Sequence, residues 1–231
     1  MSRTNASMAI AHAQRAFAFL LDLLYPPCCG GCDKHGEGWW CAACDAQTPW
    51  LSGDESRTML TLPTGESLTV ISAAQFASPL REGIHRFKYE SQPQLAEAFA
   101  ARMRAIWDAG DRSAEAADVI VPVPLHASRL RERGFNQSLL LARHIGERAG
   151  IPTTPQALQR VRATQQQAQL DAQGRQANVR GAFVARSELV TGKAIALVDD
   201  VFTTGATLME CASVLYQSGA RRVIALTLAR A

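Results

Sequence analysis

The sequence has few aromatic residues, little charge and almost no lysine. Aromatic residues make up 6% of its 231 residues and charged residues 19%, against 47% hydrophobic residues. This composition is typical of a globular protein and excludes a wholly disordered chain. The formal net charge of +3 is too small to indicate a partner. The length suits one domain with an appendage.

The sequence also lacks a long hydrophobic run near its N-terminus. The apolar run at 16–25, AFAFLLDLLY, is too short to span a bilayer, and Asp22 interrupts it. Basic residues precede the run, as in a signal peptide, but no cleavage site of small residues follows it. We therefore expect no membrane span. Residues 1–25 should form a short amphipathic helix that docks on the body of a cytoplasmic protein.

Arginine accounts for most of the positive charge. Of the 24 basic residues, 21 are arginine, and the segment 126–193 holds eleven basic but only four acidic residues. Within it, Arg129, Arg131 and Arg133 alternate along what we expect to be a loop. Arginine binds phosphate through two parallel hydrogen bonds, so the segment hints at an anionic ligand. A genome rich in G and C would produce the same excess of arginine.

The spacing of apolar residues predicts alternating strands and helices. Strands are expected at 67–76, 118–124, 193–200 and 221–229, and helices at 94–107, 138–150 and 208–218. Gly150 and Gly219 should cap the last two helices. Strand, helix and strand over 193–229 form a βαβ unit, which predicts an α/β fold with parallel strands. The polar segment 160–182 is either a mobile lid or a plain surface loop.

Five of the six cysteines lie within 26–50. Cys29 and Cys32 form one CxxC pair, and Cys41 and Cys44 form a second pair after a gap of eight residues. Two such pairs can supply four thiolates to one tetrahedral zinc ion. Four thiolates leave no open position for a reactant, so the zinc would be structural. Disulfides are the alternative, which a cytoplasmic protein disfavours.

The residues around these pairs refine the expectation. Gly30 and Gly31 allow a tight turn that leaves backbone N–H groups free to face sulfur. Cys28 is the alternative ligand to Cys29, although Cys29 gives the standard CxxC spacing. Cys211 falls on the apolar face of a predicted helix, so we expect it in the core.

A second unusual stretch is ALVDDVFTTGAT at 196–207. Asp199 and Asp200 come at the end of an apolar strand, where parallel sheets bind ligands. The run from Thr203 to Thr207 leads into a helix N-terminus, whose N–H groups and hydroxyls can bind phosphate. The carboxylates would repel that phosphate, but they can hold hydroxyl groups or a divalent metal beside it. A ribose 5-phosphate meets both requirements, whereas ordinary helix capping explains a single Thr or Asp.

This stretch resembles the signature with which type I phosphoribosyltransferases bind phosphoribosyl pyrophosphate (PRPP). Three further segments, together with the cysteine pairs upstream, resemble the ComF family of competence proteins. They are FKY at 87–89, PVPLHASRLRERGFNQ at 122–137 and RATQQQAQLDAQGRQANVRGAF at 162–183. The resemblance covers about residues 26–230 and its motifs occur in the same order.

The resemblance implies a fold and a site. The fold is a zinc ribbon at 26–60, after the helix at 1–25, followed by a type I phosphoribosyltransferase-like domain at 61–231. Carried over by position, Asp199 and Asp200 would hold the ribose hydroxyls or a magnesium-bound water. The 5-phosphate would lie against Thr203, Thr204, Gly205, Ala206 and Thr207, and the pyrophosphate would face Leu125 and His126, with Arg129 and Arg133 neutralising its charge.

The family also implies a role in the uptake of single-stranded DNA during natural transformation. Single-stranded DNA and DNA-uptake proteins are then expected partners, beside PRPP with Mg²⁺. Aromatic residues for base stacking are scarce in the arginine-rich segment, which has only Phe135 and Phe183. A phosphoribosyltransferase with an unidentified acceptor and a PRPP-sensing regulator are the alternatives. No general base and no apolar lid for a nucleobase is recognisable, so we expect little transfer to nucleobases.

Overall fold

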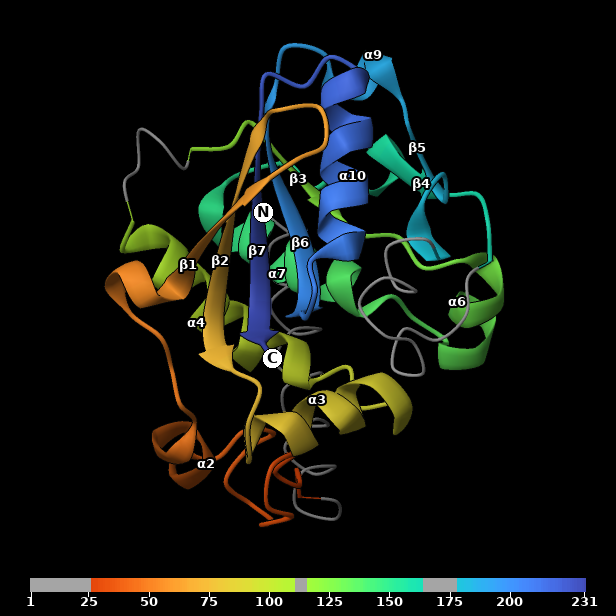
Figure 1. Cartoon of the computed structure of the whole chain (residues 1–231). Helices are drawn as coiled ribbons and strands as arrows, with labels where there is room; N and C mark the ends of the chain where they lie inside the picture. Colours follow the sequence, from red (N-terminus) through yellow and green to blue (C-terminus); the bar gives the residue numbers. More distant parts are fainter. Residues whose placement is uncertain (1–25, 111–115, 164–177) are drawn as a thin grey trace, which may run out of the picture.

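A computed structural model describes residues 26–110, 116–163 and 178–231 (Figure 1). The helix predicted at 1–25 lies outside the described residues, and so does most of the predicted lid, at 164–177. Across the described ranges, no helix combines the length and the apolar character that crossing a membrane requires. The division of the chain at residues 25 and 60 stays a prediction.

A five-stranded sheet with the strand order β1-β2-β7-β6-β3 forms the centre of the protein. The strands are β1 (Arg57–Thr61), β2 (Ser67–Gln75), β3 (Val119–Pro122), β6 (Ala194–Phe202) and β7 (Arg222–Arg230). Strand β1 is antiparallel to β2, and the other four strands are parallel. The predicted α/β class is therefore confirmed, and so is the βαβ unit, because β6 and β7 are parallel neighbours.

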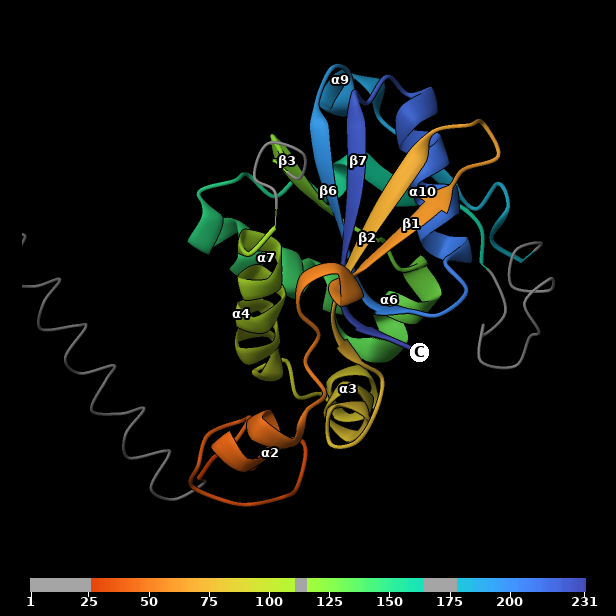
Figure 2. The ribbon, with the colours of Figure 1, turned by 60° about the vertical axis from the view of Figure 1, so that its left-hand side comes forward.

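Helices cover both faces of the sheet (Figure 2). Helix α4 (Leu95–Asp108) and helix α7 (Gln137–Ala149) pack on one face, and α10 (Ala206–Gln217) packs on the other. Alternate residues of β6 serve the two faces: Ile195 and Leu197 belong to the core beneath α10, Ala196 and Val198 to the core beneath α4 and α7. This two-sided burial explains why the strand reads as a continuous apolar run.

Several short elements complete the fold. They are α2 (Ala42–Gln47), the 3-10 turns η1 (Gly53–Ser56) and η2 (Pro155–Ala157), α3 (Leu80–Tyr89), α6 (Ala127–Arg133), the antiparallel pair β4 (Leu158–Arg160) and β5 (Phe183–Ala185), and α9 (Ser187–Val190). Helices α2 and α3 lie beyond the carboxyl ends of β2, β6 and β7 (Figure 1).

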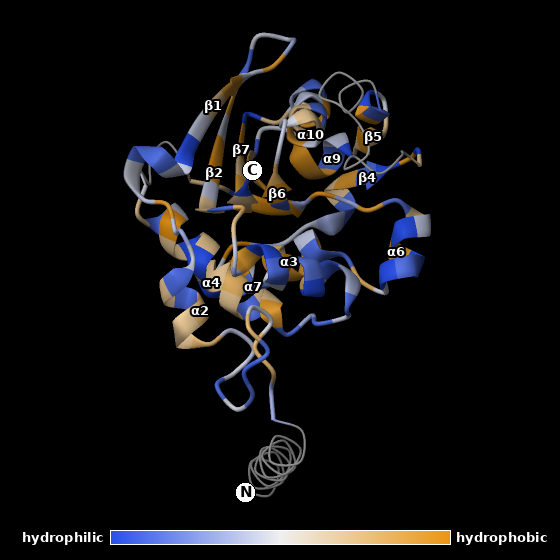
Figure 3. Ribbon diagram, turned by 60° about the horizontal axis from the view of Figure 1, so that its bottom comes forward, coloured by the Kyte–Doolittle hydropathy of each residue, from blue (hydrophilic) through white to orange (hydrophobic). Residues whose placement is uncertain are grey.

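The structure corrects two expectations at this edge. The alternating arginines, expected on a loop, lie on α6, which begins at the N-cap His126 and ends at Gly134, a left-handed C-cap with φ of 79°. Figure 3 shows that α6 is largely hydrophilic, so apolar periodicity gives no sign of it. Strand β6, expected to end at Asp200, continues to Phe202 because its pairing with β7 extends to Arg230.

Candidate functional site

A cavity of about 490 Å³ lies at the carboxyl edge of the sheet. Ten of the eleven residues predicted to bind PRPP line it: Leu125, His126, Arg129, Arg133, Asp199, Asp200, Thr203, Gly205, Ala206 and Thr207. Thr204 does not, and its buried hydroxyl has no hydrogen-bond partner among the described residues. The fold therefore brings together two predicted segments that are some seventy residues apart in the chain.

The cavity also has walls that the sequence did not predict. Lys88 and Tyr89 reach it from α3, Ser138 from α7 and Arg160 from β4. The FKY motif is the one sequence signal that points to the first two. Ser138 lies in no pattern that distinguishes it from a surface residue. Arg160 is the first residue of the polar segment 160–182, which was expected to be either a lid or a plain surface loop.

The two adjacent carboxylates have different partners. Asp199 Oδ1 accepts hydrogen bonds from Ser138 Oγ and from the backbone N–H of Asp200, both at 2.9 Å. Asp200 Oδ1 lies 2.8 Å from Lys88 Nζ, and these two side chains are 12% and 20% exposed, respectively. Burial raises the pKa of Asp199 to about 7, and the neighbouring Asp200 carboxylate contributes to the rise.

This raised pKa predicts a pH-dependent effect of Asp199→Asn. The folded state binds a proton at Asp199 more tightly than the unfolded state, so ionisation destabilises the protein as pH rises from about 4 to 7. Asparagine retains the acceptor oxygen but does not ionise. We expect the variant to be stabilised by on the order of 2 kcal/mol at pH 8 and to lose this advantage near pH 4. Chemical denaturation across this pH range measures the difference.

Asp118 supplies a control of opposite sign. The backbone N–H of Ala194, and then Arg221, lower the pKa of its carboxyl. Its stabilising effect is present at neutral pH and is lost on acidification, so Asp118→Asn should destabilise the protein at pH 7 and approach the unaltered protein in acid. If both variants showed the same trend with pH, the assignment for Asp199 would be wrong.

Asp199 and Asp200 together are called the acid pair below. Helix α10 begins close to this pair and has no side-chain cap. Its N-cap, Gly205, is left-handed with φ of 78°. The first backbone bond within the helix runs from the N–H of Met209 to the carbonyl of Gly205. The N–H groups of Ala206, Thr207 and Leu208 precede that bond, and all three residues line the cavity. An uncapped helix N-terminus carries partial positive charge and favours an anion.

Helix α6 forms the basic wall of the cavity. Arg129 and Arg133 are four residues apart, so they share one face of the helix, and both line the cavity, whereas Arg131 is exposed and does not. Arg129 pairs with Glu132 at 2.8 Å. Arg133 donates to Gln137 and lies 4.9 Å from the centre of the Tyr89 ring. His126 accepts from the N–H of Ser128 and so caps the helix.

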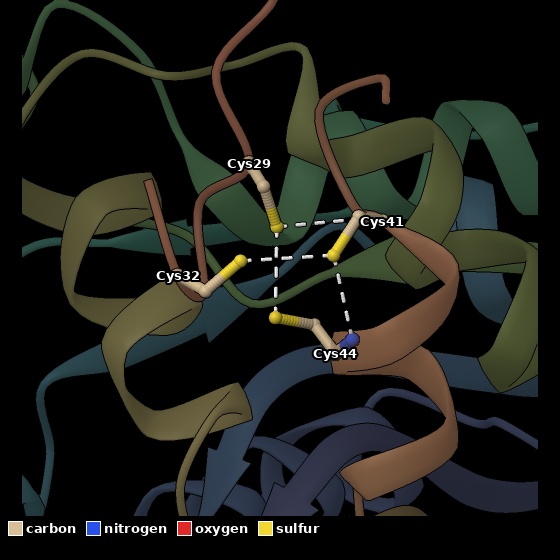
Figure 4. A group of neighbouring side chains, drawn as sticks. All are labelled: Cys29, Cys32, Cys41 and Cys44. Atoms are coloured by element: carbon tan, nitrogen blue, oxygen red, sulfur yellow. Dashed lines mark hydrogen bonds between the residues drawn. The ribbon is translucent and has the colours of Figure 1, made fainter. Parts of the chain in front are cut away.

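A second candidate site is the cysteine cluster near α2 (Figure 4). The four Sγ atoms of Cys29, Cys32, Cys41 and Cys44 lie within 4.8 Å of one another. Two of these separations are 3.6 and 3.7 Å. A tetrahedral zinc ion with Zn–S bonds of about 2.3 Å requires S···S distances of about 3.8 Å, so the four cysteines can hold a zinc ion.

The backbone around the cluster supports this arrangement. The N–H groups of Gly31 and Cys41 point at Cys29 Sγ, at 3.5 and 3.3 Å, as the glycine turn predicts. A Cβ atom on Gly31 would lie 2.7 Å from Cys44 Sγ, so the turn has no room for a side chain. Cys28 faces Asp33 and is outside the cluster. Cys211 is fully buried in the core, as expected.

Helix α3 joins the two sites. Arg86 donates to both carboxylate oxygens of Asp33, at 2.5 and 2.6 Å, and to the carbonyl of Cys29. Gly83 packs so tightly that an added Cβ atom would lie 2.7 Å from the Trp40 ring. Two residues after Arg86, the same helix presents Lys88 to the cavity.

The solved structures that resemble this fold include a PRPP amidotransferase and phosphoribosyltransferases. One is the glutamine PRPP amidotransferase of B. subtilis complexed with ADP and GMP, with 24% identity, a TM-score of 0.41 and coverage of 61% of this chain and 30% of that one. Another is the orotate phosphoribosyltransferase of Mycobacterium tuberculosis, with 15% identity, a TM-score of 0.34 and coverage of 78% and 77%. No protein-family model matches the chain.

Curated relatives are more similar in sequence. The chain is 36% identical over 157 residues to "DNA utilization protein YhgH" of Salmonella typhimurium, which covers 67% of this chain and 68% of that protein. It is 28% identical over 152 residues to "Competence protein ComFC" of Bacillus subtilis, covering 65% and 60%. It is 30% identical over 209 residues to "Competence protein F" of Haemophilus influenzae, covering 88% and 90%. Because that identity extends over nearly the whole of both proteins, the chain belongs to the ComF family of competence proteins, as its motifs predict.

Proposed function

We propose that the cavity binds PRPP or a related ribose 5-phosphate, and that the protein acts in the cytoplasm as an accessory factor in the uptake and use of single-stranded DNA. One observation carries the first part. The acid pair on β6 and the uncapped N-terminus of α10 open into the same cavity. Its volume of about 490 Å³ is in the range of small-molecule sites, about 300–1,000 Å³.

Each part of the ligand has a matching part of the cavity. The 5-phosphate lies at the start of α10, where Thr203 and Thr207 add hydroxyls to the backbone N–H groups. The ribose hydroxyls donate to Asp199 and Asp200. The pyrophosphate faces Leu125 and His126 and the basic wall of α6. Mg²⁺ would arrive on the pyrophosphate oxygens, since phosphate oxygens are its usual ligands.

The zinc ion is proposed as a structural part of the same protein. Four thiolates complete its coordination, so its contribution is to fold the segment around α2 and to fix the contacts with α3. A site of four thiolates requires that the cysteines stay reduced, as they do in the cytoplasm, and this supports the cytoplasmic location.

The DNA part of the proposal is supported by the names of the relatives and by the arginines. "DNA utilization protein" is the name of one relative and "Competence protein F" of another. Base stacking has little support from the two phenylalanines of the arginine-rich segment, because Phe183 is buried and Phe135 packs 5.8 Å from the Phe87 ring. DNA binding would therefore be mainly electrostatic and would weaken steeply with salt.

Calorimetric titration with PRPP and Mg²⁺ tests the proposal. We expect saturable binding with a submillimolar dissociation constant. PRPP should also raise the melting temperature, because a ligand that binds only the folded state stabilises it. Asp200→Asn should weaken binding about tenfold or more, through the loss of a charged acceptor for the ribose hydroxyls. Asp54→Asn, at an exposed residue outside the cavity, is the matched control.

Two outcomes would contradict the proposal. Absence of binding at millimolar PRPP would overturn the ligand. Release of pyrophosphate when a nucleobase is added would favour the transferase instead. In the same buffers, a labelled single-stranded oligonucleotide should bind at low salt and less so as salt rises. Replacing Arg129, Arg131 and Arg133 together should flatten that dependence, and an unchanged slope would remove α6 from the DNA surface.

A further inference from the structure

The acid pair already has a cation from the protein itself. Lys88 Nζ lies 2.8 Å from Asp200 Oδ1, with both side chains largely buried. Buried opposite charges at this distance attract each other strongly, and the ammonium still has donors for a second partner. Because both residues line the cavity, the ammonium stands where a ligand would meet the acid pair.

The position of Lys88 is fixed by its helix. The preceding residue, Phe87, is fully buried, and Arg86 holds Asp33 through two hydrogen bonds. Lys88 is one of three lysines in the chain, and the other two, Lys34 and Lys193, lie outside the cavity. The packing of Phe87 and the contacts of Arg86 hold this part of α3 in place. They therefore fix the position of Lys88 in the wall of the cavity.

The acid pair does not fit a protein-bound Mg²⁺ as it stands. One oxygen of Asp200 is engaged by Lys88, and Asp199 Oδ1 accepts two hydrogen bonds. Magnesium prefers several oxygen ligands in octahedral geometry. In the described part of the chain, the one cluster of three or more potential metal-ligating side chains is that of the four cysteines.

We propose that Lys88 takes the place of a divalent cation at the acid pair, so that the cavity binds ribose 5-phosphate without Mg²⁺. The inference rests on the proposed function and adds a specificity-determining residue to it. The ammonium offsets the charge of Asp200, which would otherwise repel the phosphate. Ribose 5-phosphate has no pyrophosphate, so it brings no chelating group of its own to the site.

The experiment is a calorimetric titration of the whole protein with ribose 5-phosphate, once with EDTA and once with excess Mg²⁺. We expect the unaltered protein to show the same dissociation constant in both buffers, to within about twofold. Lys88→Met should bind about tenfold more weakly or worse in EDTA. Mg²⁺ should restore much of that loss, because removal of the ammonium frees the Asp200 carboxylate for a metal ion.

Control variants separate charge from structure. Lys88→Arg retains the positive charge and should remain independent of Mg²⁺. Lys193 directly precedes the first residue of β6, at the other end of the strand from the acid pair. Lys193→Met should therefore behave as the unaltered protein. Melting temperatures show that each variant is folded. If Lys88→Met does not fold, Lys88→Met combined with Asp200→Asn removes both charges of the pair, and it should bind weakly in both buffers.

The outcomes distinguish this inference from the proposed function. Binding of ribose 5-phosphate that needs Mg²⁺ in the unaltered protein, or that is unchanged in Lys88→Met, overturns the inference while leaving a ribose phosphate site in place. Binding of PRPP with Mg²⁺ but not of ribose 5-phosphate also overturns it. Failure of both ligands in both buffers overturns the proposed function itself.

Discussion

Replacing Cys29 by serine is expected to remove the metal from the cysteine cluster and to unfold the segment around it. The thiol of Cys29 is completely buried and lies 3.6 Å from Cys44 Sγ. It accepts hydrogen bonds from two backbone N–H groups. Structural zinc contributes about 10–16 kcal/mol to folding in zinc-finger peptides, and an alcohol is a far weaker ligand than a thiolate. This is the largest effect that we expect from a single substitution.

Metal analysis and near-ultraviolet circular dichroism measure the effect. The unaltered protein should hold about one zinc ion per chain, and Cys29→Ser should hold almost none. The signal of Trp40 should change with the metal, because its ring packs against the cluster. Cys28→Ser is the matched control. The thiol of Cys28, the residue next to Cys29, faces Asp33 and should not be needed to bind the metal. Loss of zinc from Cys28→Ser, with retention in Cys29→Ser, would reverse the assignment.

Replacing Gly205 by valine is expected to abolish binding of PRPP and to lower the melting temperature by several degrees. The residue has φ of 78°, a region that a β-branched residue seldom adopts. Its Cβ atom would lie 2.9 Å from the Phe202 ring and 3.0 Å from Leu60 Cδ1. Strain and overpacking together cost roughly 2–5 kcal/mol. Relief of that strain would move the start of α10, where the phosphate is proposed to bind.

Gly192→Val separates backbone strain from the effect on the site. Gly192 has φ of 73°, but an added Cβ atom there meets nothing within 4 Å. Gly192 lies just before the first residue of β6, at the other end of the strand from the cavity. This variant should therefore lose stability but retain its affinity for PRPP. Melting curves and calorimetric titration of both variants provide the comparison. If Gly205→Val bound PRPP as tightly as Gly192→Val, the start of α10 would not be the phosphate site.

The parts of the candidate site that are contiguous in sequence were predictable, because local patterns encode them. The run from Asp199 to Thr207 joins a buried strand to a helix N-terminus, and both elements follow from the spacing of apolar residues. The cysteine cluster follows from the spacing of two CxxC pairs. In both cases, neighbours along the chain are also neighbours in space.

The partners of the acid pair could not be predicted in the same way. Ser138 and Lys88 are 61 and 112 residues away from the carboxylates that they contact, and their positions depend on how α7 and α3 pack. Helix α6 was missed because its polar sequence has no apolar face, so its ends depend on caps at His126 and Gly134. Strand β6 was expected to end at Asp199 and Asp200 because charged side chains are rare inside a strand.

Strand β1 has a consequence for how the protein can be divided into fragments. A fragment that begins at residue 61 would retain only the last residue of β1, and the backbone of β2 would lose its partner from Leu68 to Ile71. Strand β2 is largely buried and apolar, without charged side chains. A newly exposed edge of this kind is a template for pairing with a second molecule. Shortened fragments should therefore begin before Arg57, or they will tend to aggregate.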